Sequence, residues 1–367
     1  MTIPRPDDRL ARAREAIARA DAEWLLIPAS ADFRWLTGGR ARATERLLLF
    51  ALPRAGEGWC LVPRLEADGL AAQCPWLELE IWDEHENPLA RLAGRIGLER
   101  RPALLLGEGF RTGPLLDLAA RAPSRPAAPV IAPLRACKDA EELAALAIAG
   151  RHADRVMAET SASLRPGMTE AQVARAILDR FAALGDHDAW AIVAAGANSA
   201  SPHHMTSDRP LVAGEPVLLD LGAYHDGYAS DITRTFTLGR LDPEFERVYQ
   251  TVNAARAAGI AAVRSGIPAA AVDAAARAVI ERAGFGPRFV HRTGHGVGLE
   301  IHEPPYLVAG NDAPLAAGMV HSVEPGIYLE GRFGVRLEDL VVVESGGGRR
   351  LNDAPFLPAL DPAAGSG

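Results

Sequence analysis

The first third of the chain alternates short apolar runs with segments of helical spacing. Residues 8–20 repeat apolar positions three and four apart, which predicts a helix. The later apolar runs predict strands, and the segments between them predict helices. The runs lie at 24–29, 46–53, 58–63, 77–82 and 103–107, and the helical segments at 64–73, 88–97 and 114–122. This alternation predicts an α/β layered domain over residues 1–134.

Two stretches of this domain carry no clear periodicity. Residues 30–39 are aromatic and rich in turn formers, so we expect a loop there. Residues 122–133 are rich in proline, which predicts a linker or a final edge strand before the next domain.

From Lys138 onward the pattern changes to pairs of long helices. The first pair is predicted at 139–164 and 169–185, with Thr169 as N-cap and Gly185 as the stop. A second pair is predicted at 243–263 and 268–286. The pairs match at a constant offset of 99 residues: Arg165 with Arg264, Gly167 with Gly266, Val173 with Val272 and Gly185 with Gly284. We interpret this as an internal duplication, against the alternative of a chance alignment of alanine-rich helices.

Each helix pair leads into apolar runs that carry two acids. Residues 216–238 predict a hairpin with Asp220 in the first run and Asp231 just before the second. Residues 319–343 hold Glu324 and Glu338 on two runs separated by a glycine-containing turn. A buried strand has little reason to carry an acid unless a partner or a metal ion lies beside it. The alternative for the first hairpin is that one Asp caps a turn and the other is exposed.

Two short segments concentrate the histidines. Residues 289–305 contain His291, His295 and His302 among glycines, and residues 201–208 contain His203 and His204. Four carboxylates and one imidazole around two divalent ions would give a bridging water strong reason to ionise, which predicts hydrolysis of an amide or ester. An oxygen-rich shell with one nitrogen suits Mn²⁺, Co²⁺ or Zn²⁺.

Composition narrows the classes of partner and compartment. The 367 residues suffice for two domains, and the net charge of −8 argues against nucleic acid or an anionic membrane as partner. The three cysteines are an odd number without a short-spaced pair, which is typical of free thiols in a reducing compartment. The N-terminal segment lacks the apolar core of a signal peptide, and no apolar run reaches the ~20 residues of a membrane span. We therefore expect a cytoplasmic protein.

The motifs LLDLGAYHDGYASDITRTF, HRTGHGVGLEIHE, SVEPGIY and GVRLEDLVVV closely resemble those of the pita-bread metallopeptidases. The proline-specific branch, which holds Xaa-Pro dipeptidases (prolidases) and aminopeptidase P, is the most similar. This resemblance implies an α+β catalytic domain of duplicated halves over residues 135–367. It also implies a smaller α/β domain of the creatinase type over residues 1–134.

The resemblance further implies a dinuclear metal site with a bridging hydroxide as nucleophile. Asp220 would bind one ion, Asp231 and Glu338 would bridge both, and His295 and Glu324 would bind the second. Glu324 would also serve as general base or proton shuttle. The ions would be Mn²⁺, Co²⁺ or Zn²⁺, two in each subunit.

The remaining site residues are also inherited from the resemblance. His203 and His302 match histidines that steady the substrate carbonyl or the developing oxyanion. His291 and Arg336 match positions that contact substrate or hold the ligands. His204 has no such counterpart and is interpreted as a neighbour. A homodimer is implied as well.

The expected substrate is a dipeptide or short peptide with proline in its second position. Three alternatives stay open. Methionine aminopeptidase shares the metal site but generally lacks such an N-terminal domain. Creatinase-like enzymes and non-catalytic binding members keep the fold but lose the metal ligands, whereas all five ligand positions are occupied here. The sequence does not separate a dipeptidase from an aminopeptidase P.

Overall fold

The computed structural model describes residues 5–240 and 242–360. The chain forms two compact units, residues 1–135 and residues 136–367, called here the N-terminal unit and the C-terminal unit. Residues 1–4, which belong to the segment tested for a signal peptide, lie outside the described residues. Among the described helices, none has both the length and the apolar composition that crossing a membrane requires.

The N-terminal unit is a six-stranded mixed sheet in the order β4-β3-β2-β1-β5-β6. The strands are β1 (Trp24–Pro28), β2 (Leu49–Pro53), β3 (Trp59–Pro63), β4 (Glu78–Trp82), β5 (Leu104–Leu106) and β6 (Ser124–Pro126). The helices are α1 (Asp7–Arg19), α2 (Ala31–Thr37), α3 (Arg64–Gln73), α4 (Pro88–Ile96), α5 (Thr112–Arg121) and α6 (Ala128–Ala136), with a 3₁₀ turn η1 (Leu98–Arg100). Every strand and helix predicted here from hydrophobic periodicity is present.

The expectation of a loop at 30–39 is wrong, because α2 occupies most of it. The Ser30 side chain accepts a hydrogen bond from the Phe33 amide and caps the helix, and Gly38, with φ of 73°, ends it. The turn formers therefore mark the ends of a short helix. In the proline-rich stretch, β6 is the predicted edge strand, whereas α6 after it was not expected.

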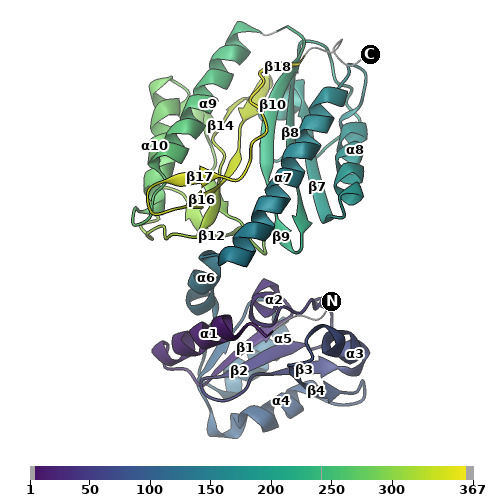
Figure 1. The fold of residues 1–367 in the computed structure, drawn as a ribbon, viewed down its shortest axis with the longest axis vertical. Helices are drawn as coiled ribbons and strands as arrows, with labels where there is room; N and C mark the ends of the chain where they lie inside the picture. The colour runs from purple at the N-terminus through teal and green to yellow at the C-terminus, as the bar shows by residue number, and fades with distance from the viewer. Residues whose placement is uncertain (1–4, 241, 361–367) are drawn as a thin grey trace. The chain divides into compact units, whose positions relative to one another are not determined.

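The C-terminal unit contains both predicted helix pairs (Figure 1). The first pair is α7 (Ala140–Ser163) with α8 (Glu170–Ala183), and the second is α9 (Pro243–Ala262) with α10 (Ala269–Arg282). Thr169 caps α8 through a capping box with Gln172. Gly167 and Gly266 have φ of 91° and 89°, and Gly185 and Gly284 have φ of 81° and 85°. The glycines matched in sequence thus turn the backbone in the same left-handed way.

Two five-stranded sheets lie between these helix pairs in Figure 1. The first has the order β18-β10-β8-β7 with β9 paired to β8, and the second has the order β12-β11-β13-β16-β17. The first sheet comprises β7 (His187–Ala195), β8 (Pro216–His225), β9 (Tyr228–Ala229), β10 (Ile232–Leu238) and β18 (Ala359–Leu360). The second comprises β11 (Gly294–Gly296), β12 (Glu303–Leu307), β13 (Val320–Val323), β16 (Asp339–Val343) and β17 (Gly348–Arg350). A 3₁₀ turn η2 (Gly196–Ala200) follows β7, and η3 (Gly286–Arg288) follows α10.

The hairpin predicted at 216–238 is confirmed, since β8 and β10 pair antiparallel with Asp220 opposite Thr233. The second acid-bearing region is more complex than predicted. Its two runs each divide, so that β13 pairs with β16, while β14 (Gly326–Leu329) and β15 (Phe333–Arg336) form a separate two-stranded sheet. Glu324 lies between β13 and β14, and Glu338 lies between β15 and β16, so neither residue belongs to a strand.

Candidate metal centre

A cavity of about 510 Å³ opens within the C-terminal unit. All nine candidate site residues from the sequence line it: His203, Asp220, Asp231, His291, His295, His302, Glu324, Arg336 and Glu338. The other lining residues are Trp190, Ile192, Pro202, Arg292 and Ile301. Segments almost 150 residues apart in the chain therefore supply one polar cluster with an apolar wall beside it.

The first acid pair lies on the β8–β10 hairpin. Asp220 belongs to β8, and its Oδ2 accepts a hydrogen bond of 2.6 Å from Arg336 Nη2. Asp231 directly precedes β10 and is only 5% exposed. The strand pairing therefore fixes both carboxylates on the cavity wall.

Glu338 joins the second half of the unit to this hairpin. Its backbone N–H donates to the Thr233 carbonyl at 3.1 Å, and its Oε2 accepts from Thr233 Oγ1 at 2.6 Å. Its Oε1 is buried and has no hydrogen-bond partner among the described residues. A buried carboxylate oxygen without a donor is costly, which marks this atom as aimed at something the chain does not supply.

His295 brings the acids together. Its Nε2 lies 3.1 Å from Glu324 Oε1 and 3.7 Å from Asp231 Oδ2. Asp231, His295 and Glu338 each offer a ligand-type atom, and these atoms lie within 4.8 Å of one another. The backbone on both sides of His295 packs closely against the neighbouring strands, because a Cβ at Gly294 or Gly296 would collide with their backbone oxygens.

The pKa values of the clustered carboxyl groups indicate an excess of buried negative charge. Burial, together with Glu338 and Asp220, raises the pKa of Asp231 well above its usual range. Burial and the charges of Glu324 and Asp220 do the same to the pKa of Glu338. Burial opposes ionisation of Glu324 too, but the bond and charge of His295 lower its pKa to about 2. Without a cation, the cluster would have to retain protons to remain buried.

A chain of hydrogen bonds orients His291 at the cavity wall. Arg336 Nη1 donates to the Tyr328 hydroxyl at 3.0 Å, and this hydroxyl lies 2.9 Å from His291 Nε2. His291 Nδ1 lies 2.7 Å from the Arg292 carbonyl, so Nδ1 carries the proton and Nε2 accepts from Tyr328. Burial lowers the pKa of His291, which favours this neutral form.

The other two histidines come from loops. His203 follows η2, and Arg336 Nη1 holds its loop by donating to the Pro202 carbonyl at 3.3 Å. His302 packs against His295 with ring centroids 4.2 Å apart. His204 turns away from the cavity, and its Nε2 lies 2.9 Å from the buried carboxylate of Glu170. This contact fits the interpretation of His204 as a neighbour.

Sequence reasoning missed Thr233, Tyr328 and the apolar wall. Thr233 had a signal in the sequence, because it lies two positions after Asp231, the spacing that puts two side chains on the same side of an extended chain. Tyr328 had none, since its contacts to His291 and Arg336 depend on the separate β14–β15 sheet. Trp190 and Ile192 follow from the pairing of β7 with β8, which places Ile192 opposite Asp220.

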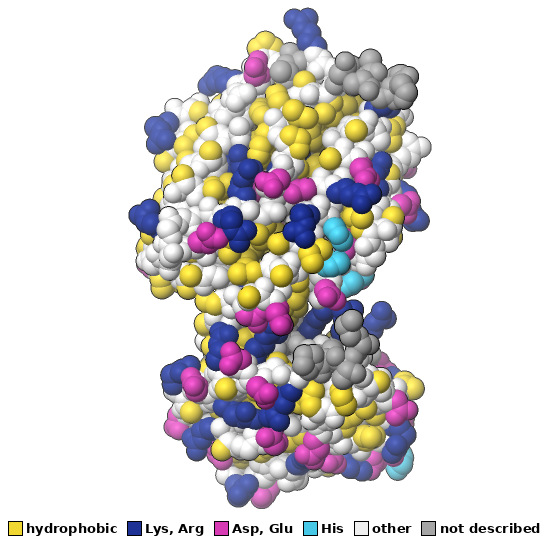
Figure 2. Space-filling view, in the orientation of Figure 1, with side chains coloured by type: hydrophobic (Ala, Val, Ile, Leu, Met, Phe, Trp, Pro, Cys, Tyr) yellow, Lys and Arg dark blue, Asp and Glu magenta, His cyan; other side chains and the backbone are white. Residues whose placement is uncertain are grey.

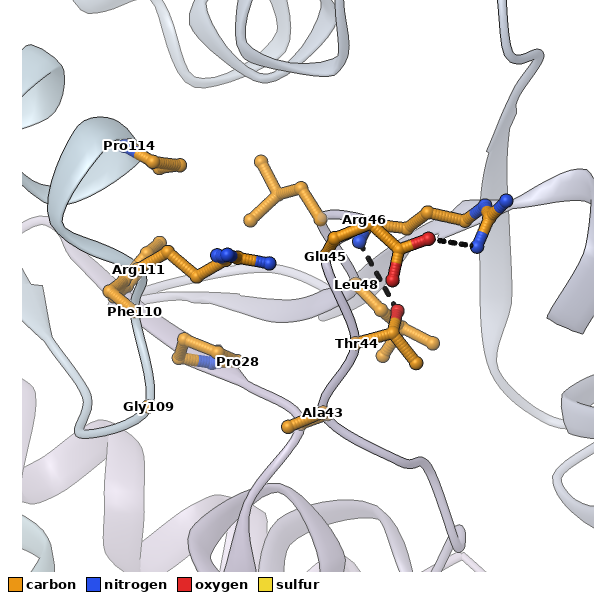
Figure 3. A pocket seen from close by; sticks show the side chains of 12 residues that line it. Pro28, Ala43, Thr44, Glu45, Arg46, Leu48, Gly109, Phe110, Arg111 and Pro114 are labelled. Carbon is orange, nitrogen blue, oxygen red and sulfur yellow. Dashed lines mark hydrogen bonds and ion pairs between the residues drawn. The ribbon is translucent and has the colours of Figure 1, made fainter.

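The N-terminal unit has a smaller pocket of about 30 Å³ (Figure 3). Of its twelve lining residues only Glu45, Arg46 and Arg111 are charged, and Arg46 Nη1 pairs with Glu45 at 2.5 Å. This lining offers neither a histidine nor a second acid, so it lacks the donor set of the large cavity.

The comparisons with known proteins agree with this geometry. Residues 144–345 match the model of metallopeptidase family M24, and residues 9–104 match that of the creatinase/prolidase N-terminal domain. The probable dipeptidase PepE of Mycobacterium tuberculosis is 40% identical over 360 residues, which cover 95% of this chain and 94% of that protein.

Solved structures extend the similarity to the fold. The dipeptidase PepE from Mycobacterium ulcerans is 40% identical with a TM-score of 0.91, covering 96% of this chain and 98% of its own. The prolidase from Thermococcus sibiricus is 34% identical with a TM-score of 0.91, covering 98% of this chain and 100% of its own. The resemblance to the proline-specific branch and the pita-bread α+β fold are thereby confirmed. The chain belongs to metallopeptidase family M24 and carries a creatinase/prolidase-type N-terminal domain.

Proposed function

We propose that the large cavity is the catalytic centre of a peptidase that hydrolyses the Xaa-Pro bond of dipeptides or short peptides. The observation that carries this proposal is the convergence of all nine candidate residues on one cavity. The proposed ligands of two divalent ions are Asp220, Asp231, His295, Glu324 and Glu338. Dipeptidases and prolidases among the similar proteins support the choice of substrate class.

The residues present fit such ions. Glu338 Oε1 is buried without a donor, and burial together with neighbouring carboxylates raises the pKa values of Asp231 and Glu338. Divalent cations would relieve both penalties at once. Four carboxylates and one imidazole form a hard donor set, which suits Mn²⁺, Co²⁺ or Zn²⁺.

Bound there, divalent ions would lower the pKa of a water and polarise the substrate carbonyl. The chain supplies the remaining functions. Glu324, held by His295 and by Ser322 Oγ at 3.0 Å, would accept and pass on a proton. Arg336 donates to Asp220 and to the Tyr328 hydroxyl, and His203, which lines the same cavity, would steady a developing oxyanion.

The apolar wall supports a proline-containing substrate. Trp190, Ile192, Pro202 and Ile301 line the same cavity as the acids. An Xaa-Pro amide has no N–H, so its recognition depends on shape around the ring. Apolar side chains supply such shape without leaving an acceptor unpaired.

One peptide series tests this proposal. We expect metal-loaded protein to cleave Ala-Pro, and cleavage confined to it among Ala-Pro, Ala-Pro-Ala and a longer Ala-Pro peptide would identify a dipeptidase. Cleavage of the longer peptides would instead indicate an aminopeptidase P. Release of methionine from Met-Ala peptides without cleavage of any Xaa-Pro bond would contradict the proposal. Protein that takes up no Mn²⁺, Co²⁺ or Zn²⁺ would contradict the metal site itself.

A further inference from the structure

Three titratable side chains converge on the C-terminal unit outside the catalytic cavity. His152 lies on α7, Asp186 lies between α8 and β7, and His225 ends β8. Each offers a ligand-type atom, and these atoms lie within 4.8 Å of one another. None of the three lines the cavity described above. We propose that they form a second, separate binding site for a divalent transition-metal ion such as Zn²⁺.

The distances are close to those of a coordinated ion. His152 Nδ1 lies 2.9 Å from Asp186 Oδ2, and His225 Nδ1 lies 2.9 Å from Asp186 Oδ1. Nitrogen and oxygen ligands lie about 2.0–2.2 Å from Zn²⁺, which places neighbouring ligand atoms of a tetrahedron roughly 3.3 Å apart. Each of these two histidine–aspartate pairs therefore needs to open by only a few tenths of an ångström to admit an ion.

The two imidazoles approach the carboxylate from different directions. Their ring centroids are 4.9 Å apart and their planes meet at 76°, so the rings are edge to face instead of stacked. Both Nδ1 atoms nevertheless face the same carboxylate, as a site with two histidines and one carboxylate requires.

The scaffold holds the three ligands at fixed positions. Gly185, with φ of 81°, ends α8, and the Asp186 amide donates back to the Phe181 carbonyl at 3.1 Å, which fixes the carboxylate at the helix end. His225 is held by the β8–β9 turn, in which Asp226 and Gly227 both have positive φ. His152 lies within the regular helix α7. A bound ion would therefore join α7, the turn after α8 and the end of β8.

The site is also open to solvent on one side. The Asp186 side chain is 2% exposed, whereas those of His152 and His225 are 22% and 28% exposed. Figure 2 shows histidine side chains gathered on the visible face of this unit, near the positions of β7 and β9 in Figure 1. An ion can thus enter from solvent, keep one or more water ligands and be coordinated by the buried Asp186 carboxylate.

Hydrogen bonding alone is the competing explanation for the cluster. Two neutral imidazoles protonated at Nδ1 would also satisfy Asp186 at these distances. Metal binding replaces both Nδ1 protons, so the two explanations differ in metal content and in the state of the Nδ1 atoms.

The test is metal content after chelator-stripped protein is dialysed against buffered Zn²⁺. We expect wild-type protein to hold an additional equivalent of Zn²⁺ relative to both His152→Gln and His225→Gln, with peptidase activity retained in both variants. His187→Gln is the matched control, because His187 Nδ1 pairs with Asp188 at 2.9 Å without a second histidine. This control should hold as much Zn²⁺ as wild type.

A second measurement needs no variant. Long-range ¹H–¹⁵N spectra of wild-type protein should show Zn²⁺ shifting the Nδ1 resonances of His152 and His225. Equal Zn²⁺ content in wild type and both triad variants, or the same loss in His187→Gln, would overturn the proposal. Unshifted Nδ1 resonances at saturating Zn²⁺ would do so independently.

Discussion

The two halves of the C-terminal unit, which begin with α7 and with α9, repeat the same backbone hydrogen bonds. They differ in the buried acidic side chain that holds the loop after the second helix, called here the anchor of each half. The Gly167 amide donates to the Leu211 carbonyl at 2.8 Å, and the Gly266 amide donates to the Leu315 carbonyl at the same distance. Isolated bridges also recur, between Thr169 and Pro210 and between Pro268 and Pro314. The second helix of each pair, α8 or α10, also carries one buried acid that holds a loop. The hydrogen-bond partners of the two acids differ.

In the first half the acid is Glu170, which is fully buried and accepts five hydrogen bonds. The donors are the Ala195 and Ser207 amides, the Ser207 hydroxyl, the Asn198 amide group and His204. They lie on both sides of His203. Glu170 is therefore a positioning residue for the loop that carries this histidine.

In the second half the acid is Asp273, which is paired with an arginine. Arg277 Nε and Nη2 each donate to it at 3.0 Å, and the amide and hydroxyl of Thr293 donate to it at 3.1 and 2.7 Å. Arg277 also donates to the His291 carbonyl at 2.9 Å. This anchor holds the segment that leads into His295, a proposed ligand. The difference teaches that one duplicated backbone can hold the His203 loop in one half and the His295 segment in the other through different side-chain contacts.

The largest effect is expected where the two halves meet. Asp231→Asn and Glu338→Gln each remove one charge from the proposed shared ligands, one from each half. We expect both to lower activity and metal content together, with activity falling more than ~100-fold, since even outer partners of metal ligands are worth ~10–100-fold. Kinetics and metal analysis measure this. Glu344→Gln, an exposed acid after β16, should behave as wild type. Near-normal turnover of either charge variant would contradict the dinuclear site.

The second test separates the two anchors. Asp273→Asn leaves Arg277 without its buried carboxylate and loosens the segment before His295. We expect metal affinity to fall about 10–100-fold, as for other supports of metal ligands. Titration of stripped protein with Mn²⁺ measures this. If Asp273→Asn lowered turnover while leaving metal affinity at the wild-type value, the two anchors would not be distinct.

Glu170→Gln should give the opposite pattern. The glutamine NH₂ would face donors that now meet a carboxylate oxygen, so the His203 loop should loosen. We expect turnover to fall roughly 10-fold with normal metal content, and the free energy of unfolding to fall by about 1–3 kcal/mol, the cost of unsatisfied buried polar groups. Loss of bound metal in this variant would contradict the assignment of Glu170 to the His203 loop.

Lowering the pH perturbs Glu170 more mildly than a substitution does, because it protonates the carboxylate and leaves the side chain in place. Burial works against the charge of Glu170, but bonds from Ser207, Asn198 and His204 bring its pKa below the usual 4.5. A lowered folded-state pKa contributes stability that is present above the unfolded value and lost as the pH falls through the folded value. The stability difference between wild type and Glu170→Gln should therefore shrink from about pH 4.5 downward. Urea unfolding at several pH values measures it, and a difference that grew with acid would be the wrong sign.

The smallest effect concerns the repeated turns. Gly167 and Gly266 have nearly equal positive φ, and no atom lies within 4 Å of an added Cβ at either position. Replacement by alanine should cost roughly 1–2 kcal/mol at each, from left-handed backbone strain alone. Thermal unfolding should give matching losses for Gly167→Ala and Gly266→Ala. Clearly unequal losses would show that the halves have diverged at the turns as well as at the anchors.

The sequence was informative where the signal is local. Hydrophobic periodicity located β1 to β5 and the helices α1, α3, α4 and α5 of the N-terminal unit, and Thr169 and Gly185 marked the ends of α8. It was wrong at α2, because Ser30 and Gly38 read as loop residues until the helix between them is seen. It also missed that the runs around Glu324 and Glu338 break into four strands, since strand pairing is set by distant partners.

The sequence by itself therefore determined most of the helices and strands, the duplication and the residue types of the candidate site, because turn chemistry, periodicity and spacing are local properties of the chain. Only the tertiary structure decided which oxygen of Glu338 lacks a donor, that Tyr328 joins Arg336 to His291, and that His152 meets His225 across Asp186. These features depend on side chains from separate elements meeting within hydrogen-bond distance. Such meetings follow from the packing of helices against sheets, which no short stretch of sequence specifies.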